Sequence, residues 1–181
     1  MTDSPSASES PSAPTAAAPP GVYRLDPART VVRADVKAMF GLITVHGTLQ
    51  LRSGEVMVGD TAAESSVRAT IDAGSFSSGN ATRDRDVVSP ALLDAAAYPE
   101  ITFTGQGASQ DGARWLVPGS VTAHGVTAPA TLTMDDIRSD DGAVRFHAIT
   151  TLDRTTFGVT KKKGMVGTAV AVTIEAVAVP A

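Results

Sequence analysis

The chain has no cysteine among its 181 residues, which excludes disulfide bonds and thiolate metal sites. Aromatic residues are scarce, at 4% of the chain, so alanine, valine and other modest apolar side chains must fill much of the interior. Basic residues are not in excess either. The net charge of −4 argues against general nucleic-acid binding, because the phosphate backbone requires clustered lysine and arginine. No apolar run approaches the length of a membrane-spanning helix.

Recognisable catalytic signatures are also missing. The sequence contains no G-x-S-x-G nucleophile elbow, no phosphate-binding loop and no H-E-x-x-H zinc motif. His46, His124 and His147 are isolated and have no metal-ligand spacing. We therefore predict no catalytic residue, no metal site and no cofactor. Because active sites assemble in space, a missing motif lowers the expectation of catalysis without excluding it.

Two regions differ sharply in composition. Residues 1–20 consist mostly of serine, proline, alanine and threonine, which bury too little apolar area to offset chain entropy, so a disordered tail is expected. This segment lacks the basic and apolar regions of a secretory signal, and the expected location is the cytoplasm. Residues 21–181 form one expected domain with enough chain to bury a core.

The stretch from residue 67 to residue 105 carries the clearest pattern. Residues 67–73 alternate between apolar and polar side chains, with Ile71 on the apolar face, and this alternation predicts a strand. Ile101 and Phe103 alternate with threonines and predict a second strand. A polar connection separates the two.

A short helix is expected within that connection. Ser89 is a suitable N-cap, and Pro90 suits the first helical position, where its missing N–H costs nothing. The helix would end before Pro99, which disfavours helix in the preceding residue. About two turns of helix are too short to be stable alone. Leu92 and Leu93 are therefore expected to pack against an apolar neighbour.

Short alternating runs separated by turn residues continue through the rest of the domain. They lie at residues 22–26, 30–37, 43–51, 55–58, 113–122, 130–137, 144–148 and 168–179. About eight strands with short connections predict an all-β fold, either a closed antiparallel barrel or a sandwich. An eight-stranded barrel can just enclose one small ligand, and small inward side chains indicate an apolar cavity.

Five segments together resemble the YceI-like family. They are YRLDPART at 23–30, IDAGSFSSGNATRDRD at 71–86, AAYPEITF at 96–103, GSVTAHGVTAP at 119–129 and LDRTTFGV at 152–159. Members of this family resemble lipocalins in fold and bind polyisoprenoid lipids. The resemblance implies a lipocalin-like antiparallel β-barrel of about eight strands with one short helix. Family members commonly carry histidine where this chain has Arg29, Ala38 and Asp86, so its head-group preference is expected to differ.

The predicted lipid-binding residues form two groups. The apolar group is expected to face the barrel interior or to lie in the short helix, and it comprises Ile71, Leu92, Leu93, Ile101, Phe103, Trp115 and Phe146. The resemblance places the polar group, Arg83 and Asp84, near the barrel mouth. There the two side chains either brace the loop or let Arg83 bind a polar lipid head group.

The predicted function is non-catalytic binding or carriage of an amphipathic isoprenoid-type lipid in the barrel cavity. Two alternatives stay open, namely an enzyme that uses the barrel as a reaction chamber and a ligand-free β-sandwich interaction module. The expected partner is an isoprenoid or other long-chain lipid. The three lysines at 161–163 are expected to form a solvated loop, with transient contact to an anionic membrane surface as the alternative. A homodimer stays open, and no nucleic-acid partner is expected.

Overall fold

The computed structural model of the protein describes residues 18–181, and strands dominate that part of the chain. The elements are β1 (Gly21–Leu25), β2 (Val31–Ala38), β3 (Ile43–Val58), η1 (Ala62–Glu64), β4 (Ser66–Ser77), α1 (Ala81–Val88), β5 (Glu100–Gln106), β6 (Ser109–Asp111), β7 (Arg114–Ala123), β8 (Val126–Asp140), β9 (Ala143–Asp153), η2 (Arg154–Phe157) and β10 (Val166–Pro180). The predicted disordered tail lies outside the described residues except for its last three. None of the helices found between residues 18 and 181 is long and apolar enough to span a bilayer.

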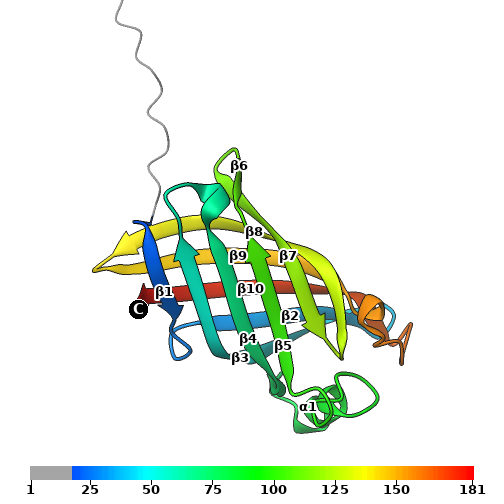
Figure 1. Cartoon of the computed structure of the whole chain (residues 1–181). Helices are drawn as coiled ribbons and strands as arrows, with labels where there is room; N and C mark the ends of the chain where they lie inside the picture. The colour runs from blue at the N-terminus through cyan, green and yellow to red at the C-terminus, as the bar shows by residue number, and fades with distance from the viewer. Residues whose placement is uncertain (1–17) are drawn as a thin grey trace, which may run out of the picture.

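Eight strand positions form a closed antiparallel barrel (Figure 1). Around the barrel the neighbours are β10, β2, β3, β4, β5, β7, β8 and β9, and β9 pairs with β10 to close the ring. The closing pair runs in register from Ala169 opposite Asp153 to Ala178 opposite Val144. The structure confirms the predicted lipocalin-like barrel, and the alternative of a sandwich is wrong. β6 is a short addition that pairs only with β7 among the described strands.

The strands β1 and β2 share one edge of β10. β2 pairs with the first part of β10, and β1 pairs with its last three residues, from Ala178 to Pro180. The corner between them is fixed by Asp26, whose carboxylate accepts hydrogen bonds from the Ala28 N–H at 2.9 Å and from Arg29 Nε at 2.7 Å. The buried Thr30 then accepts a bond from the Val177 N–H at 3.3 Å. A turn at residues 27–29 thus joins β1 to β2.

The α-helix lies earlier in the chain than the sequence predicted. Asn80 is its N-cap, with a side chain that accepts a hydrogen bond from the Arg83 N–H at 3.0 Å. Ser89 is the C-cap in an extended conformation, because Pro90 disfavours helix in the residue before it. The predicted helix beginning at Ser89 was therefore wrong: the proline ends a helix here instead of starting one.

Consecutive turns follow α1, and they bury Leu92. Leu92 is only 6% exposed, so the expected burial of this side chain is confirmed without a helix around it. The N–H groups of Leu93 and Ala95 donate to the carbonyls of Val87 and Val88, which ties the turns to the end of α1.

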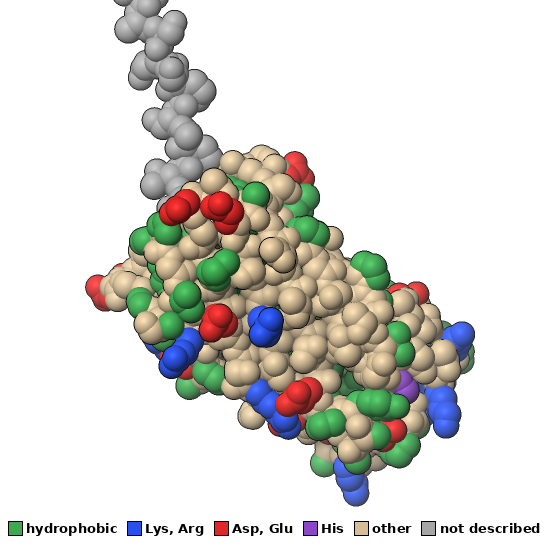
Figure 2. All heavy atoms as spheres, viewed as in Figure 1, with side chains coloured by type: hydrophobic (Ala, Val, Ile, Leu, Met, Phe, Trp, Pro, Cys, Tyr) green, Lys and Arg blue, Asp and Glu red, His purple; other side chains and the backbone are tan. Residues whose placement is uncertain are grey.

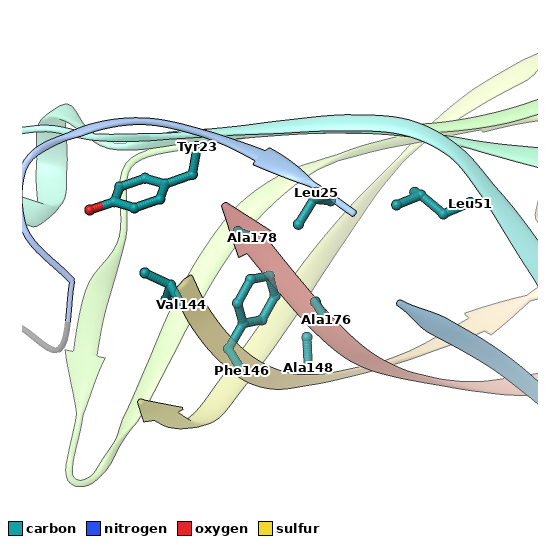
Figure 3. Close-up of a cluster of buried hydrophobic side chains, with 8 residues drawn as sticks. All are labelled: Tyr23, Leu25, Leu51, Val144, Phe146, Ala148, Ala176 and Ala178. Atoms are coloured by element: carbon teal, nitrogen blue, oxygen red, sulfur yellow. The ribbon is translucent and has the colours of Figure 1, made fainter. Parts of the chain in front are cut away.

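Two clusters of buried apolar side chains fill opposite sides of the barrel. The first cluster comes from β1, β3, β9 and β10 and contains Tyr23, Leu25, Leu51, Val144, Phe146, Ala148, Ala176 and Ala178 (Figure 3). The second cluster comes from β5, β7, β8 and η2 and contains Phe103, Val117, Val121, Ala128, Leu132 and Phe157. Met134 is partly buried and packs against both clusters.

Arg154, the first residue of η2, is a buried charged side chain with 8% of its surface exposed. Its guanidinium donates to four backbone carbonyls at 2.7 to 2.9 Å, those of Val159, Lys161, Val166 and Gly167. Burial lowers the pKa of Arg154 below its ordinary value, but a guanidinium remains protonated at neutral pH. One side chain therefore holds the whole connection from η2 to β10.

Replacing Arg154 tests this role. Arg154→Met removes all four hydrogen bonds and leaves carbonyls without their donor, so we expect a loss of at least about 3 kcal/mol in the free energy of unfolding. Arg52→Met is the matched control, because Arg52 is 41% exposed in its bridges to Asp72 and Glu100 and its loss should cost less than about 1 kcal/mol. Urea unfolding measures both. Equal losses in the two variants would contradict the assignment.

The Asp26 corner predicts a pH dependence. The hydrogen bond from Arg29 and the one from the Ala28 N–H lower the pKa of Asp26 from its ordinary value of 3.8. Because the pKa of Asp26 is lower in the folded protein, its contribution to stability is fully present above pH 3.8. This contribution is lost as the pH falls through the pKa that Asp26 has in the folded protein. Melting temperatures measured from neutral to strongly acidic pH should therefore fall less steeply in Asp26→Asn than in the unsubstituted protein. Parallel curves would show that the corner contributes nothing to acid sensitivity.

Candidate functional site

The barrel has two unlike ends (Figure 1). At one end β1 begins, η1 joins β3 to β4, and β8 turns into β9; we call this the cavity end. At the other, α1 follows β4, η2 precedes β10, and β2 turns into β3; we call this the helix end. The two ends of the barrel therefore present different surfaces.

An apolar cavity of about 200 Å³ opens at the cavity end, between the two core clusters. Its apolar wall consists of Ala18, Tyr23, Val56, Val58, Ala62, Val67, Ala108, Trp115, Val117, Leu132, Met134, Ile137, Val144, Phe146 and Ala178. Ala178 places a small side chain of β10 on the first-cluster side of the cavity. Most of this wall is aliphatic, and Tyr23, Trp115 and Phe146 supply its aromatic side chains.

The polar part of the lining comes from the connection between β3 and β4. It contributes Asp60, Thr61, Ser65 and Ser66. Ser65 Oγ accepts a bond from the Gly59 N–H at 3.1 Å and donates to the Thr61 carbonyl at 3.2 Å. The rim is thus braced by its own hydrogen bonds before any ligand arrives.

A second connection anchors this rim. The N–H of Gly107 donates to the Ser65 carbonyl at 2.7 Å, and the N–H of Ala108 donates to the Ala62 carbonyl at 2.9 Å. Gly59 has no room for a side chain, because a Cβ there would lie 2.6 Å from Glu64 Cβ. These contacts keep a hydroxyl-bearing rim at a fixed place over an apolar interior.

Two of the predicted residues, Trp115 and Phe146, line the cavity. Phe103 is buried in the second cluster, and Ile101 packs against the same cluster. Ile71 packs against the first cluster. These last three belong to the apolar interior but are not among the residues that line this cavity.

The remaining predicted residues lie at the helix end, opposite the cavity opening. Asp84 accepts bonds from Ser78, from its N–H at 3.0 Å and from its hydroxyl at 2.6 Å, so this carboxylate braces the loop before α1. Among residues 18–181, Arg83 and Asp84 form no salt bridge with each other. Leu92 and Leu93 lie in the turns after α1. Lipid contact by these four residues stays a prediction.

Sequence reasoning missed most of the cavity wall. Val144 and Leu132 could have been found, because each alternates in phase with an apolar neighbour on its strand, Phe146 and Met134 respectively. Tyr23 lies in the first strand, and its hydroxyl donates to the Pro19 carbonyl at 2.8 Å. The rim carried no such signal, because residues 59–66 show neither the strand nor the helix periodicity of apolar side chains.

The cavity lining provides apolar contacts and few groups that could take part in acid–base chemistry. Among the described residues, Asp60 and Tyr23 are the titratable groups of its lining. The histidines lie elsewhere: His46 pairs with Asp35, His147 pairs with Asp135, and Nδ1 of His124 donates to the Phe157 carbonyl at 3.1 Å. No cluster of three or more metal-ligating side chains occurs in the described part of the chain. The geometry suits binding of an apolar group with a polar end near the hydroxyls.

Comparison with known proteins identifies similar chains. Residues 23–178 match the YceI-like domain family. Protein YceI of Escherichia coli O157:H7 is 38% identical over 66 residues, which are 36% of this chain and 35% of that protein. The sequence alignment thus spans about a third of the length of the curated relatives it matches.

Solved structures show the same fold. BcnA of Burkholderia cenocepacia is 23% identical with a TM-score of 0.76, over 84% of this chain and 98% of that one. A polyisoprenoid binding domain from Saccharophagus degradans is 15% identical with a TM-score of 0.65, over 88% and 98% of the two chains. The YceI protein of Campylobacter jejuni is 19% identical with a TM-score of 0.63, over 75% and 85%.

The lone tryptophan makes the cavity testable without knowledge of its natural ligand. N-phenyl-1-naphthylamine is a neutral apolar probe that should enter the cavity, gain fluorescence and quench Trp115. Ala178→Phe fills the cavity and should abolish both changes, whereas Ala171→Phe places the same ring on the exposed face of β10 and should not. Fluorescence titration measures the effect. Unchanged probe binding in Ala178→Phe would contradict the site.

Proposed function

The chain belongs to the YceI-like domain family, and from that premise we propose that it binds an amphipathic isoprenoid-type lipid in its cavity and carries it unchanged. The observation that carries this proposal is the apolar cavity with a hydroxyl-bearing rim at its opening. A similar fold in a protein described as a polyisoprenoid binding domain supports the same ligand class. The expected cytoplasmic location is part of the proposal.

The volume of the cavity limits how much lipid it can hold before any side chain moves. A dry cavity of about 150 Å³ can hold a benzene molecule. The 200 Å³ here accordingly suit one or two five-carbon units. Each buried unit contributes about 3–4 kcal/mol against water, at roughly 0.8 kcal/mol per methylene. Moving the lipid from a membrane into the cavity changes the free energy little, because the lipid already lies in hydrocarbon. A small free-energy change suits a carrier that takes up and releases its lipid.

A longer chain requires the two core clusters to separate. Met134 lines the cavity and packs against both clusters, so it occupies the place where the cavity would lengthen. Methionine is unbranched and flexible, and it fills irregular gaps without fixing their shape. Movement of Met134 would extend the cavity from the rim toward Phe103 and the helix end.

The enzymatic alternative has no supporting observation in the described lining. Ser65, a hydroxyl at the rim, bonds to the backbone of its own loop rather than to a general base. Nucleophilic catalysis requires a base within hydrogen-bond reach of the nucleophile. Binding is therefore the function that the geometry supports best.

The proposal predicts that the protein purified from a cell carries lipid. Mass spectrometry of an organic extract should detect an isoprenoid-type lipid at a substantial fraction of one molecule per chain. Ala178→Phe should lose it, and Ala171→Phe should keep it. If overpacking unfolds Ala178→Phe, then Val58→Phe blocks the cavity from the β3 side. An unsubstituted protein that carries no lipid and takes none from isoprenoid-containing vesicles would overturn the proposal.

A further inference from the structure

The helix end carries an exposed apolar surface that the cavity does not explain. We call it the apolar tip, and it consists of Met39, Phe40, Leu42, Ile43 and Met165. Phe40 is 76% exposed and Leu42 is 82% exposed, the two largest values among the exposed large apolar residues of the described chain. The tip joins the turn between β2 and β3 to the loop before β10. Contiguous exposed apolar side chains of this kind mark a surface that meets a partner.

The tip is held in shape by its backbone. The N–H of Met39 donates to the Met165 carbonyl at 2.7 Å, and the N–H of Phe40 donates to the Gly164 carbonyl at 3.0 Å. A Cβ on Gly164 would lie 3.2 Å from the Phe40 ring, so the glycine makes room for that ring. Arg154 fixes the same loop from inside through the carbonyls of Lys161, Val166 and Gly167.

Folding alone does not favour these residues at the tip. Met39 and Phe40 have φ angles of +51° and +58°, in the left-handed region that glycine and asparagine adopt more readily. Two bulky apolar side chains thus occupy strained positions and face solvent. Backbone strain of this kind persists where the surrounding structure imposes it, and it collects at functional positions.

Charge around the tip indicates what it meets. Lys37, Lys161, Lys162 and Lys163 are exposed beside it. Lys162 pairs with Asp86 of α1, and the other three take part in no salt bridge that the structure shows between residues 18 and 181. A cluster of lysines around an apolar tip complements a surface that is anionic outside and apolar beneath.

The cavity end carries no lysine among the described residues, and its exposed arginines, Arg114, Arg138 and Arg145, lie among carboxylates. Its exposed acidic side chains are Asp60, Glu64, Asp111, Asp140 and Asp141. Figure 2 shows carboxylates near that end, and basic side chains together with some carboxylates at the helix end. All four lysines of the described chain therefore lie at the helix end, and this is the end that an anionic surface attracts more strongly.

From these observations we propose that the apolar tip inserts into the surface of an anionic phospholipid membrane, with the lysines on the head groups. The docked protein stands with its cavity opening directed away from the bilayer. This inference does not rest on what the cavity holds. A second copy of the chain fits the tip less well, because a tip-to-tip dimer would bring two lysine clusters together.

Vesicle binding tests the proposal with the full chain. We expect co-sedimentation with vesicles of equal parts phosphatidylcholine and phosphatidylglycerol, weaker binding at high salt, and little binding to phosphatidylcholine alone. The double variant Phe40→Asn with Leu42→Ser should bind at least about tenfold more weakly, from the lost apolar burial. Asparagine tolerates the left-handed backbone at residue 40, so this variant should fold.

The matched control lies at the cavity end. Val22 and Met57 face each other on β1 and β3 and are 43% and 40% exposed, and Val22→Ser with Met57→Ser should leave vesicle binding unchanged. Lys161→Gln and Lys163→Gln should weaken binding about fivefold for each lysine removed. Equal binding by the tip and control variants, or no binding by the unsubstituted protein, overturns the proposal.

The absence of cysteine allows a direct measure of insertion. Leu42→Cys and Met57→Cys each accept a single nitrobenzoxadiazole label, and only the label at residue 42 should shift to the blue on anionic vesicles. A shift at residue 57 instead would show docking through the cavity end. Light scattering measures the molar mass of the unsubstituted protein and of the tip variant. If the first is a dimer and the second a monomer, the tip is a dimer interface and the proposal is overturned.

Discussion

The pairing of β10 along both of its edges is the constraint on which the structure depends. One edge bonds to β9 over ten residue pairs, and the other bonds to β2 and then to β1. Closure leaves the ring of eight strands without a free edge and defines a single interior. The cavity, the two core clusters and the two unlike ends of the barrel all follow from that closed ring.

Strand alternation predicted the barrel well but located the site only in part. Alternation gives the face on which a side chain lies, and it correctly pointed Trp115 and Phe103 inward. It does not give the height along the barrel axis, which depends on the stagger between neighbouring strands. Trp115 therefore lines the cavity, whereas Phe103 packs in a solid cluster beside Gly105 and Gly119, whose missing side chains make room for its ring.

Connections were harder to predict than strands, for a physical reason. The dipeptide Ser89-Pro90 is compatible with the start of a helix and with the end of one. In the structure Asn80 caps the N-terminus of the preceding segment, so the helix forms before Ser89 and ends there. The rim and the apolar tip are built by backbone hydrogen bonds between segments far apart in the sequence, such as Met39 with Met165. No local pattern encodes such a contact.

The double pairing of β10 also has a consequence for how the protein is made. Ribosomes deliver the chain from its amino-terminal side, and β2 must wait for β10 before one of its edges is covered. Until then, seven barrel strands can form only an open sheet whose inner apolar face is bare. Long-range pairing of this kind is slow and leaves intermediates exposed to aggregation. A nascent chain that has not yet delivered β10 therefore leaves this apolar face uncovered, and the ring closes only once its last strand has been made.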